Sequence, residues 1–117
     1  MLERFTPRLL GPKAWGTELL IAHTPSYIGK VLSMRAGEGG PLQYHEQKDE
    51  TFFLYSGKAQ VTSSESGVAY LTTLMLPGES FHVPPWTIHQ VTALDDCVFF
   101  EVSTPHFDDR VAVERES

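Results

Sequence analysis

The sequence predicts an all-β protein, a sandwich or barrel of eight or more short strands. Runs of four to eight apolar and β-branched residues recur along the chain at a spacing of about ten residues. Gly, Pro or an Asp-Asp pair separates consecutive runs, and these are residues that turns prefer. No segment of about eleven residues keeps apolar side chains at helical spacing behind a capping box, so helices are not expected.

The order of the elements follows from the same turn residues. The N-terminal residues 1–18 include Pro7 and Pro12 and show no sustained period, so we predict an irregular arm that ends at Trp15-Gly16. The charged tail 106–117 is either a final edge strand or a frayed terminus. Between arm and tail, strands are predicted at 19–24, 27–36, 42–45, 50–57, 58–64, 68–76, 80–85, 88–94 and 97–104.

Composition limits the domain count and the partners. A chain of 117 residues and 13.1 kDa supports one hydrophobic core, so we expect a single domain over 1–117. A formal net charge of −6 and scattered basic residues argue against binding to nucleic acid or to an anionic membrane surface. No apolar run reaches the roughly 18 residues that a transmembrane helix needs, and the N-terminus lacks the apolar core of a secretory signal. We therefore expect a cytoplasmic protein.

Cys97 is the only cysteine, so no internal disulfide can form, which agrees with a reducing compartment. It precedes the apolar residues Val98 and Phe99. We expect a small buried hydrophobe rather than a nucleophile.

Four polar side chains interrupt or adjoin runs that otherwise predict buried strands. Gln43 and His45 are two residues apart, so on a strand they point to the same face. Glu50 opens the next strand after a short connection, and His89 follows a Pro-Pro turn at the head of another. If the face of Gln43 lines the interior of a barrel, Gln43, His45 and Glu50 enter one cavity, which His89 can join from a neighbouring strand.

Two imidazoles, one carboxylate and one amide oxygen suit zinc, manganese, iron(II) or nickel in a site that keeps one or two positions open. Because Glu50 is the one ionised ligand, a divalent ion leaves such a site positive and favours an anionic ligand. Gln43 either binds the metal through its amide oxygen or orients His45. The alternative without a metal is a pair of core histidines bonded to backbone groups, with Glu50 as a solvated turn residue.

Two stretches resemble the two sequence motifs of the cupin superfamily. The first motif is formed by Gly37, Gln43, His45, Glu50 and Gly57, and the second by Gly78, Pro84 and His89. In the first motif, glutamine stands where the family usually has its first histidine. In the second motif, Trp86 replaces the usual glycine and Ala93 the usual asparagine.

This glutamine variant resembles the small cupin domain of the mannose-6-phosphate isomerase and mannose-1-phosphate guanylyltransferase group. The likeness covers about residues 12–105 and includes the entry segment Lys13-Ala14-Trp15-Gly16. It implies a cupin-type double-stranded β-helix, a jelly-roll barrel with its core at about 17–105. It also implies one divalent transition metal, held by Gln43, His45, Glu50 and His89.

Two further side chains are candidates for moving protons. Glu101 lies inside the apolar run 97–104, and His82 lies two residues before Pro84. Inside the cavity, either one could act as an acid or a base. The alternatives are a buried partner or an outward edge position for Glu101, and the solvent for His82.

The resemblance implies an isomerase or epimerase of a sugar or sugar phosphate, with a small polar molecule in the barrel cavity. Cupin dioxygenases and lyases share the scaffold, and a non-catalytic module that binds a metal or small molecule is the alternative from another class. A homodimer is expected because the exposed strand edges of an open barrel must be covered. Tyr44, Phe53 and Tyr55 fall on the face opposite the ligands, where they suit a dimer interface or a second sheet better than a substrate cage.

Overall fold

The computed structural model describes residues 1–115, which contain strands and no helix. The all-β prediction is therefore confirmed. No helix long and apolar enough to cross a membrane occurs in these residues. The strands are β1 Arg8–Lys13, β2 Gly16–His23, β3 Ile28–Met34, β4 Gln43–Tyr44, β5 Glu50–Ser56, β6 Ala59–Ser64, β7 Leu71–Met75, β8 Ser80–Val83, β9 Ile88–Ala93, β10 Cys97–Ser103 and β11 Val111–Ala112.

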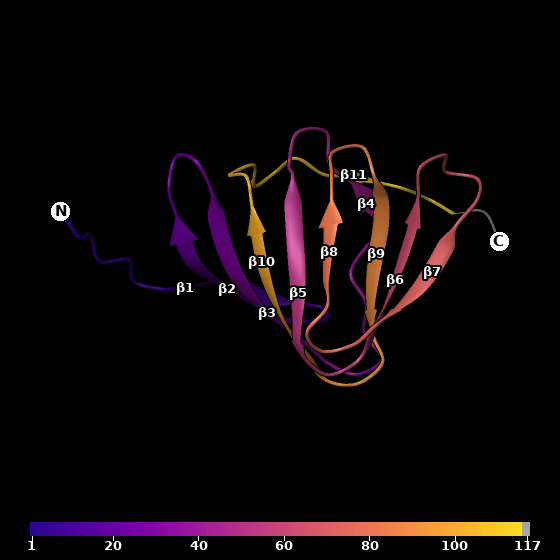
Figure 1. Cartoon of the computed structure of the whole chain (residues 1–117), viewed down its shortest axis with the longest axis horizontal. Coiled ribbons are helices and arrows are strands. Elements are labelled where there is room, and N and C mark those ends of the chain that lie inside the picture. The colour runs from indigo at the N-terminus through magenta and orange to yellow at the C-terminus, as the bar shows by residue number, and fades with distance from the viewer. Residues whose placement is uncertain (116–117) are drawn as a thin grey trace.

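The strands form two antiparallel sheets, with β1 and β2 at one side of the molecule and β6 and β7 at the other (Figure 1). The first sheet has the order β1-β2-β3-β10-β5-β8, and the second has the order β11-β4-β9-β6-β7. β10 pairs with both β3 and β5, so the first sheet joins segments that are far apart in the sequence. This arrangement fits the predicted jelly-roll barrel.

Alternation along the central strands decides what faces the interior. In β5 and β10, buried side chains alternate with more exposed ones, as in strands with one face on a core. Glu50 and Glu101 belong to these inward faces and lie at the same end of the two antiparallel strands. The apolar core contains Met34, Phe52, Leu54, Ala59, Val61, Met75, Val83, Ala93, Cys97 and Phe99. The interior is thus apolar over most of its length and polar at one end.

Gly57 allows the chain to cross from β5 in the first sheet to β6 in the second. Its φ is 98°, in the left-handed region that side chains rarely adopt. A Cβ at this position would lie 2.3 Å from the carbonyl oxygen of Asp96 and 2.8 Å from Sγ of Cys97. Only glycine fits so closely against the β9–β10 connection.

The prediction of an irregular N-terminal arm is wrong for Arg8–Lys13, which form β1, and for the residues from Gly16 on, which begin β2. β1 pairs with β2, which begins at Gly16, so the arm ends in a hairpin. Pro12 falls at a register irregularity between Leu9 and Pro12, and such irregularities allow proline in an edge strand. Pro12 therefore marks a bulge in an edge strand and not the absence of a strand.

The C-terminal tail contains a short edge strand, one of the two alternatives predicted for it. Val111 pairs with Tyr44 and Ala112 with Gln43, so β11 extends the second sheet beside β4. The last two positions of the tail, 116–117, lie outside the described residues.

Cys97 is 2% exposed, and burial raises the pKa of its thiol, as expected for a small buried hydrophobe.

Candidate metal centre

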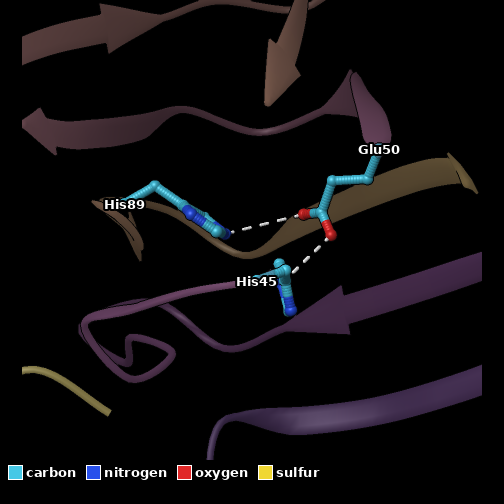
Figure 2. A group of neighbouring side chains, drawn as sticks. All are labelled: His45, Glu50 and His89. Atoms are coloured by element: carbon cyan, nitrogen blue, oxygen red, sulfur yellow. Dashed lines mark ion pairs between the residues drawn. The ribbon is translucent and has the colours of Figure 1, made fainter. Parts of the chain in front are cut away.

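His45, Glu50 and His89 converge at the polar end of the barrel, where the two imidazoles approach the carboxylate (Figure 2). Nε2 of His45 lies 3.3 Å from one carboxylate oxygen of Glu50, and Nε2 of His89 lies 3.6 Å from the other. All three residues are buried. One ligand atom from each lies within 4.8 Å of the others.

Strand pairing explains why these side chains meet. Glu50 is the first residue of β5, His89 lies near the start of β9, and His45 directly follows β4. Gln43 on β4 pairs with His89 on β9, and its side-chain oxygen is buried. All four predicted ligand residues line the same cavity. The structure therefore brings the predicted set together, while its metal-binding role remains a prediction.

Hydrogen bonds fix the tautomer of both histidines. Nδ1 of His45 lies 2.6 Å from the backbone oxygen of Asp109, and Nδ1 of His89 lies 2.9 Å from that of Thr87. A carbonyl oxygen can only accept, so each Nδ1 carries the proton. Nε2 of each neutral ring is then left with a free lone pair directed toward Glu50, the arrangement typical of metal-binding histidines.

Two buried acceptors at this centre have no hydrogen-bond partner, namely Gln43 Oε1 and His45 Nε2, while Glu50 Oε2 has the Lys48 ammonium 3.1 Å away. A buried acceptor without a donor costs roughly 1–3 kcal/mol, and a cation would satisfy both of these atoms while pairing with the Glu50 carboxylate. Neighbouring ligands that each lie about 2.1 Å from a metal are roughly 3–4 Å apart. The separations of 3.3 and 3.6 Å agree with this spacing. The residues therefore fit a divalent transition metal, and zinc, manganese, iron(II) and nickel all accept this donor set.

The electrostatics of the cluster favour an ionised Glu50. Burial by itself raises the pKa of Glu50, but hydrogen bonds from His45 and His89 and the nearby charge of Lys48 lower it well below its usual range. Burial likewise opposes the charged form of His45, yet Glu50 and the carbonyl of Asp109 outweigh it and raise the pKa of His45. Without a metal, a proton on the His45 imidazole would therefore pair with the Glu50 carboxylate in the space that a cation fits.

Glu101 faces the cavity and has a buried partner there, so the outward edge position is wrong, and its use as an acid or base stays a prediction. It is 7% exposed, and one of its carboxylate oxygens lies 3.1 Å from Nζ of Lys48. The same ammonium lies 3.1 Å from Glu50 Oε2, so Lys48 bridges the two carboxylates. Attraction to Glu101 and Glu50 outweighs the effect of burial and raises the pKa of Lys48. Sequence reasoning missed Lys48, because it lies within a charged run that is typical of a solvated turn.

His82 does not face the cavity, and its use as an acid or base there is wrong. Its side chain is 59% exposed, and its Nε2 lies 2.6 Å from the carboxylate of Asp49 at the surface. On β8, the neighbouring Phe81 and Val83 are the more buried residues, so strand alternation turns His82 outward.

The aromatic residues Tyr44, Phe53 and Tyr55 also lie outside the cavity lining. Phe53 stacks on Phe100 with ring centroids 6.2 Å apart, and Tyr55 contacts the same ring at 5.3 Å. Tyr44 stacks on Trp86 at 5.6 Å. A substrate cage built from these rings is therefore excluded.

Asp109, in the tail, is a second residue that sequence reasoning missed. Its carboxylate accepts hydrogen bonds of 2.5 to 3.2 Å from the backbone N–H groups of Glu46, Gln47 and Lys48. Desolvation raises the pKa of the Asp109 carboxyl, but these three donors together lower it overall. Because its backbone oxygen also accepts from His45, Asp109 holds both the loop and the imidazole. No local pattern reveals this contact, which joins residues more than 60 positions apart.

The cluster opens into a cavity of about 280 Å³ between the two sheets. Trp15, Phe52 and Phe99 contribute apolar surface to its lining. Beyond the cluster, charged residues from β1, β2, β3 and the tail also reach it. Its size is close to the lower end, about 300 Å³, of pockets that bind small molecules.

Comparison with known proteins agrees with this geometry. The family model described as "Cupin domain" matches residues 30–103, more than half of the chain. Mannose-1-phosphate guanylyltransferase RfbM of Salmonella typhimurium is 30% identical over 77 residues. That alignment covers 66% of this chain but only 15% of RfbM, so it concerns a small part of the larger protein.

Several solved structures share the fold. The capsular polysaccharide assembling protein CapF of Staphylococcus aureus has a TM-score of 0.82 at 17% identity, over 95% of this chain and 35% of CapF. KdgF from Halomonas sp. has a TM-score of 0.75 at 22% identity, over 86% of this chain and 88% of KdgF. Oxalate decarboxylase of Bacillus subtilis, described with Mn(II) centres, has a TM-score of 0.72 at 20% identity, over 86% of this chain and 28% of the decarboxylase chain. At such identities the likeness concerns the fold alone.

Proposed function

Because the chain belongs to the cupin domain family, we propose that it is a metal-dependent isomerase or epimerase that acts on a sugar or sugar phosphate. The observation that carries the proposal is the buried carboxylate of Glu101 in the same cavity as His45, Glu50 and His89. A site that only stores a metal has no need for a further carboxylate facing the bound molecule. A site that moves a proton between carbon atoms requires a base, and this carboxylate can supply it.

His45, Glu50 and His89 would hold the metal, and the side-chain oxygen of Gln43 is a fourth donor atom facing the same space. A bound divalent ion acts as a Lewis acid that polarises a carbonyl group and a neighbouring hydroxyl. The free Nε2 atoms and the carboxylate of Glu50 are already directed inward, so metal binding needs little rearrangement of these side chains.

Glu101 is the proposed base. It takes the proton from the hydroxyl-bearing carbon next to the carbonyl and returns it to the former carbonyl carbon, while the hydroxyl proton passes between the two oxygens. The carbonyl group thereby moves by one carbon, and no proton is gained or lost. Return of the proton to the opposite face of the first carbon would give an epimer instead.

Lys48 is the proposed positioning residue for this base. Its ammonium lies 3.1 Å from both Glu101 and Glu50, so it fixes the Glu101 carboxylate relative to the ligand cluster. When Glu101 holds the substrate proton, the ion pair with Glu50 keeps Lys48 in place.

The relatives support a sugar as the substrate class. The aligned part of RfbM belongs to a guanylyltransferase of mannose 1-phosphate, and CapF is named as a capsular polysaccharide assembling protein. Both names concern sugar metabolism. The short alignment with RfbM and the low identity to CapF leave the reaction itself to experiment.

The first test is elemental analysis of untagged protein purified without a chelator, beside the variant His89→Ala. About one equivalent of a transition metal is expected in the parent, and the variant should lose most of it because one ligand is gone. Parent protein that takes up no metal, even after metal is added back, would contradict the proposal.

The second test is hydrogen exchange in D₂O. Metal-loaded protein is incubated with a panel of sugars and sugar phosphates, and NMR follows deuterium entering the carbon next to the carbonyl. Glu101→Gln should keep its metal and slow the exchange at least about 100-fold. The surface variant Glu65→Gln, which loses the same charge, should match the parent. If the metal binds and no substrate exchanges, the chain is a non-catalytic binding module instead.

A further inference from the structure

The lysines, unlike the arginines, are concentrated in one place. The chain has four lysines, Lys13, Lys30, Lys48 and Lys58, and a formal net charge of −6. Three of the four lysines line the cavity described above, and Lys58 is exposed elsewhere. Burying a charge is costly unless it is paired, so this distribution needs a physical reason.

Lys48 is accounted for by Glu50 and Glu101, but the other two lysines share one partner. Nζ of Lys30 lies 2.6 Å from Glu18 Oε1, and Nζ of Lys13 lies 3.3 Å from Glu18 Oε2. The side chain of Lys30 is 9% exposed and that of Glu18 is 11% exposed. Two ammonium groups on one carboxylate leave a surplus positive charge within the cavity wall.

Glu18 remains ionised in this arrangement. Burial alone raises its pKa, but the hydrogen bond and the charge of Lys30, assisted by Lys13, lower it overall. Elsewhere in the lining, Asp108 and Arg110 have opposite charges, and Lys48 between Glu50 and Glu101 leaves one negative charge, so the charged residues balance over the whole cavity. The negative surplus lies at the ligand cluster, where a metal ion would take it up, and the positive surplus lies at Lys13 and Lys30, where an oxyanion would.

The register of the first sheet places Lys30 beside the proposed base. Lys30 on β3 is directly opposite Glu101 on β10, and both are inward-facing residues of neighbouring strands. Side chains in such pairs start from Cβ atoms about 5 Å apart. Their charged ends nevertheless have different partners, since Lys30 contacts Glu18 and Glu101 contacts Lys48. One small molecule can therefore touch both groups.

We propose that Lys13 and Lys30 bind an oxyanion, a phosphate or a carboxylate, on the substrate whose reacting carbons lie between Glu101 and the metal centre. The inference rests on the proposed function for the position of the reacting carbons. It commits the site to acidic or phosphorylated sugars over neutral ones. Lysine ammonium groups bind phosphate as point charges, and Lys30 has three donors with one hydrogen bond to a side chain.

The test measures anion binding without catalysis. Metal-free protein is titrated at constant ionic strength with inorganic phosphate and, separately, with acetate, and the amide signals of residues 13, 18 and 30 are followed by NMR. Removing the metal prevents the anion from binding to it directly. Saturable shifts at these amides are expected with at least one of the two anions, and the anion that binds more tightly identifies phosphate or carboxylate as the natural group.

Lys30→Met and Lys13→Met should each weaken this binding at least about tenfold, because each leaves a neutral pair with Glu18. Lys58→Met loses the same charge at the surface and should bind like the parent. Lys13 is one-third exposed, so its variant tests the proposal even if Lys30→Met does not fold. Absence of saturable binding in the parent, or equal affinity in Lys13→Met and Lys58→Met, would overturn the inference. Neither result bears on metal content or on Glu101-dependent exchange, so the proposed function is judged separately.

Discussion

The two histidines of the cluster are oriented by different parts of the chain. His89 donates to the carbonyl of Thr87, two residues earlier in the same segment, whereas His45 donates to Asp109 in the C-terminal tail. The orientation of His89 is therefore a local property. That of His45 depends on the tail remaining against the loop that follows β4. Damage to the tail should reach the metal centre through His45.

Asp109→Ala should weaken metal binding about tenfold, a typical effect of losing a group that orients a ligand. The variant removes the carboxylate that accepts three backbone N–H groups of the loop, so the tail is no longer fixed to the loop. The backbone oxygen that accepts from His45 remains, but it is then held less firmly against the imidazole. Zinc affinity is measured by competition with a chelating dye. Asp95→Ala, with the same loss of charge in an exposed loop, is the control. Equal zinc affinities in the two variants would contradict the role given to Asp109.

Trp86 is held in a conformation that its side chain disfavours. Its φ is 69°, and its N–H donates to the carbonyl of His45 at 2.7 Å, which ties the two motif loops together. A residue with a Cβ in the left-handed region costs roughly 1–2 kcal/mol, which glycine avoids. Stacking on Tyr44 offsets part of this cost.

Trp86→Gly should therefore be more stable than Trp86→Ala by about 1 kcal/mol, although glycine is normally the more destabilising replacement. Both variants lose the contact with Tyr44, so the difference isolates the backbone strain. Urea unfolding of the two proteins measures it. If the alanine variant were equally or more stable, the strain at this position would be negligible.

At the scale of strands, most of the fold could be predicted because turn residues and alternation are local signals. The expected strands 50–57 and 97–104 correspond to β5 Glu50–Ser56 and β10 Cys97–Ser103. β1 was missed because Pro12 and an irregular register hide the alternation of an edge strand. The expected strand 68–76 begins only at Leu71 in β7, since Ser64 and Ser66 accept hydrogen bonds within the preceding turn.

The ligand cluster was equally predictable, because His45, Glu50 and His89 stand at motif spacing and at strand ends. Lys48 and Asp109 were not, because their roles depend on contacts across the fold. Lys48 pairs with Glu101 of β10, and Asp109 reaches the loop only because β11 pairs with β4. Strand pairing between distant segments is the information that local pattern lacks.

Gly57→Ala should destabilise the fold by more than about 2 kcal/mol, because the new Cβ meets backbone atoms and the left-handed φ is strained. A Cβ would lie 2.3 Å from Asp96 O, so β5 or the β9–β10 connection must shift. Gly40→Ala is the matched control: a Cβ there meets nothing within 4 Å, and its φ is not left-handed. Urea unfolding that gives similar losses for both variants would contradict this account of the crossing.

At the scale of the molecule, the outer face of the first sheet is unusual for an acidic protein. Ile21, Tyr55, Phe100 and Val102 are between 37% and 62% exposed. The outward-facing residues of β3, β10 and β5 include no charged side chain. The same holds for β2 up to its bulge near Leu20. We call this surface the outer sheet face, defined by Leu19, Ile21, Val31, Phe53, Tyr55, Phe100 and Val102.

We predict that the outer sheet face pairs with the same face of a second copy. Two chains that each have a formal net charge of −6 repel one another, and an uncharged apolar face lets them meet without removing charges from water. A two-fold axis through this face would bring Phe100 of each copy near its symmetry mate. The parent should therefore be a dimer at micromolar concentration by size-exclusion chromatography with light scattering.

Phe100→Lys should shift the protein to a monomer, because an isologous interface places each new charge near its copy. The residue points away from the core and is 37% exposed, so the monomer should remain folded, and metal uptake reports that it does. Val68→Lys adds the same charge at a position 87% exposed, between β6 and β7, and should stay dimeric. A monomeric parent excludes the pairing altogether. A dimer that survives Phe100→Lys requires another surface, and the unpaired strand edges are then the alternative to test.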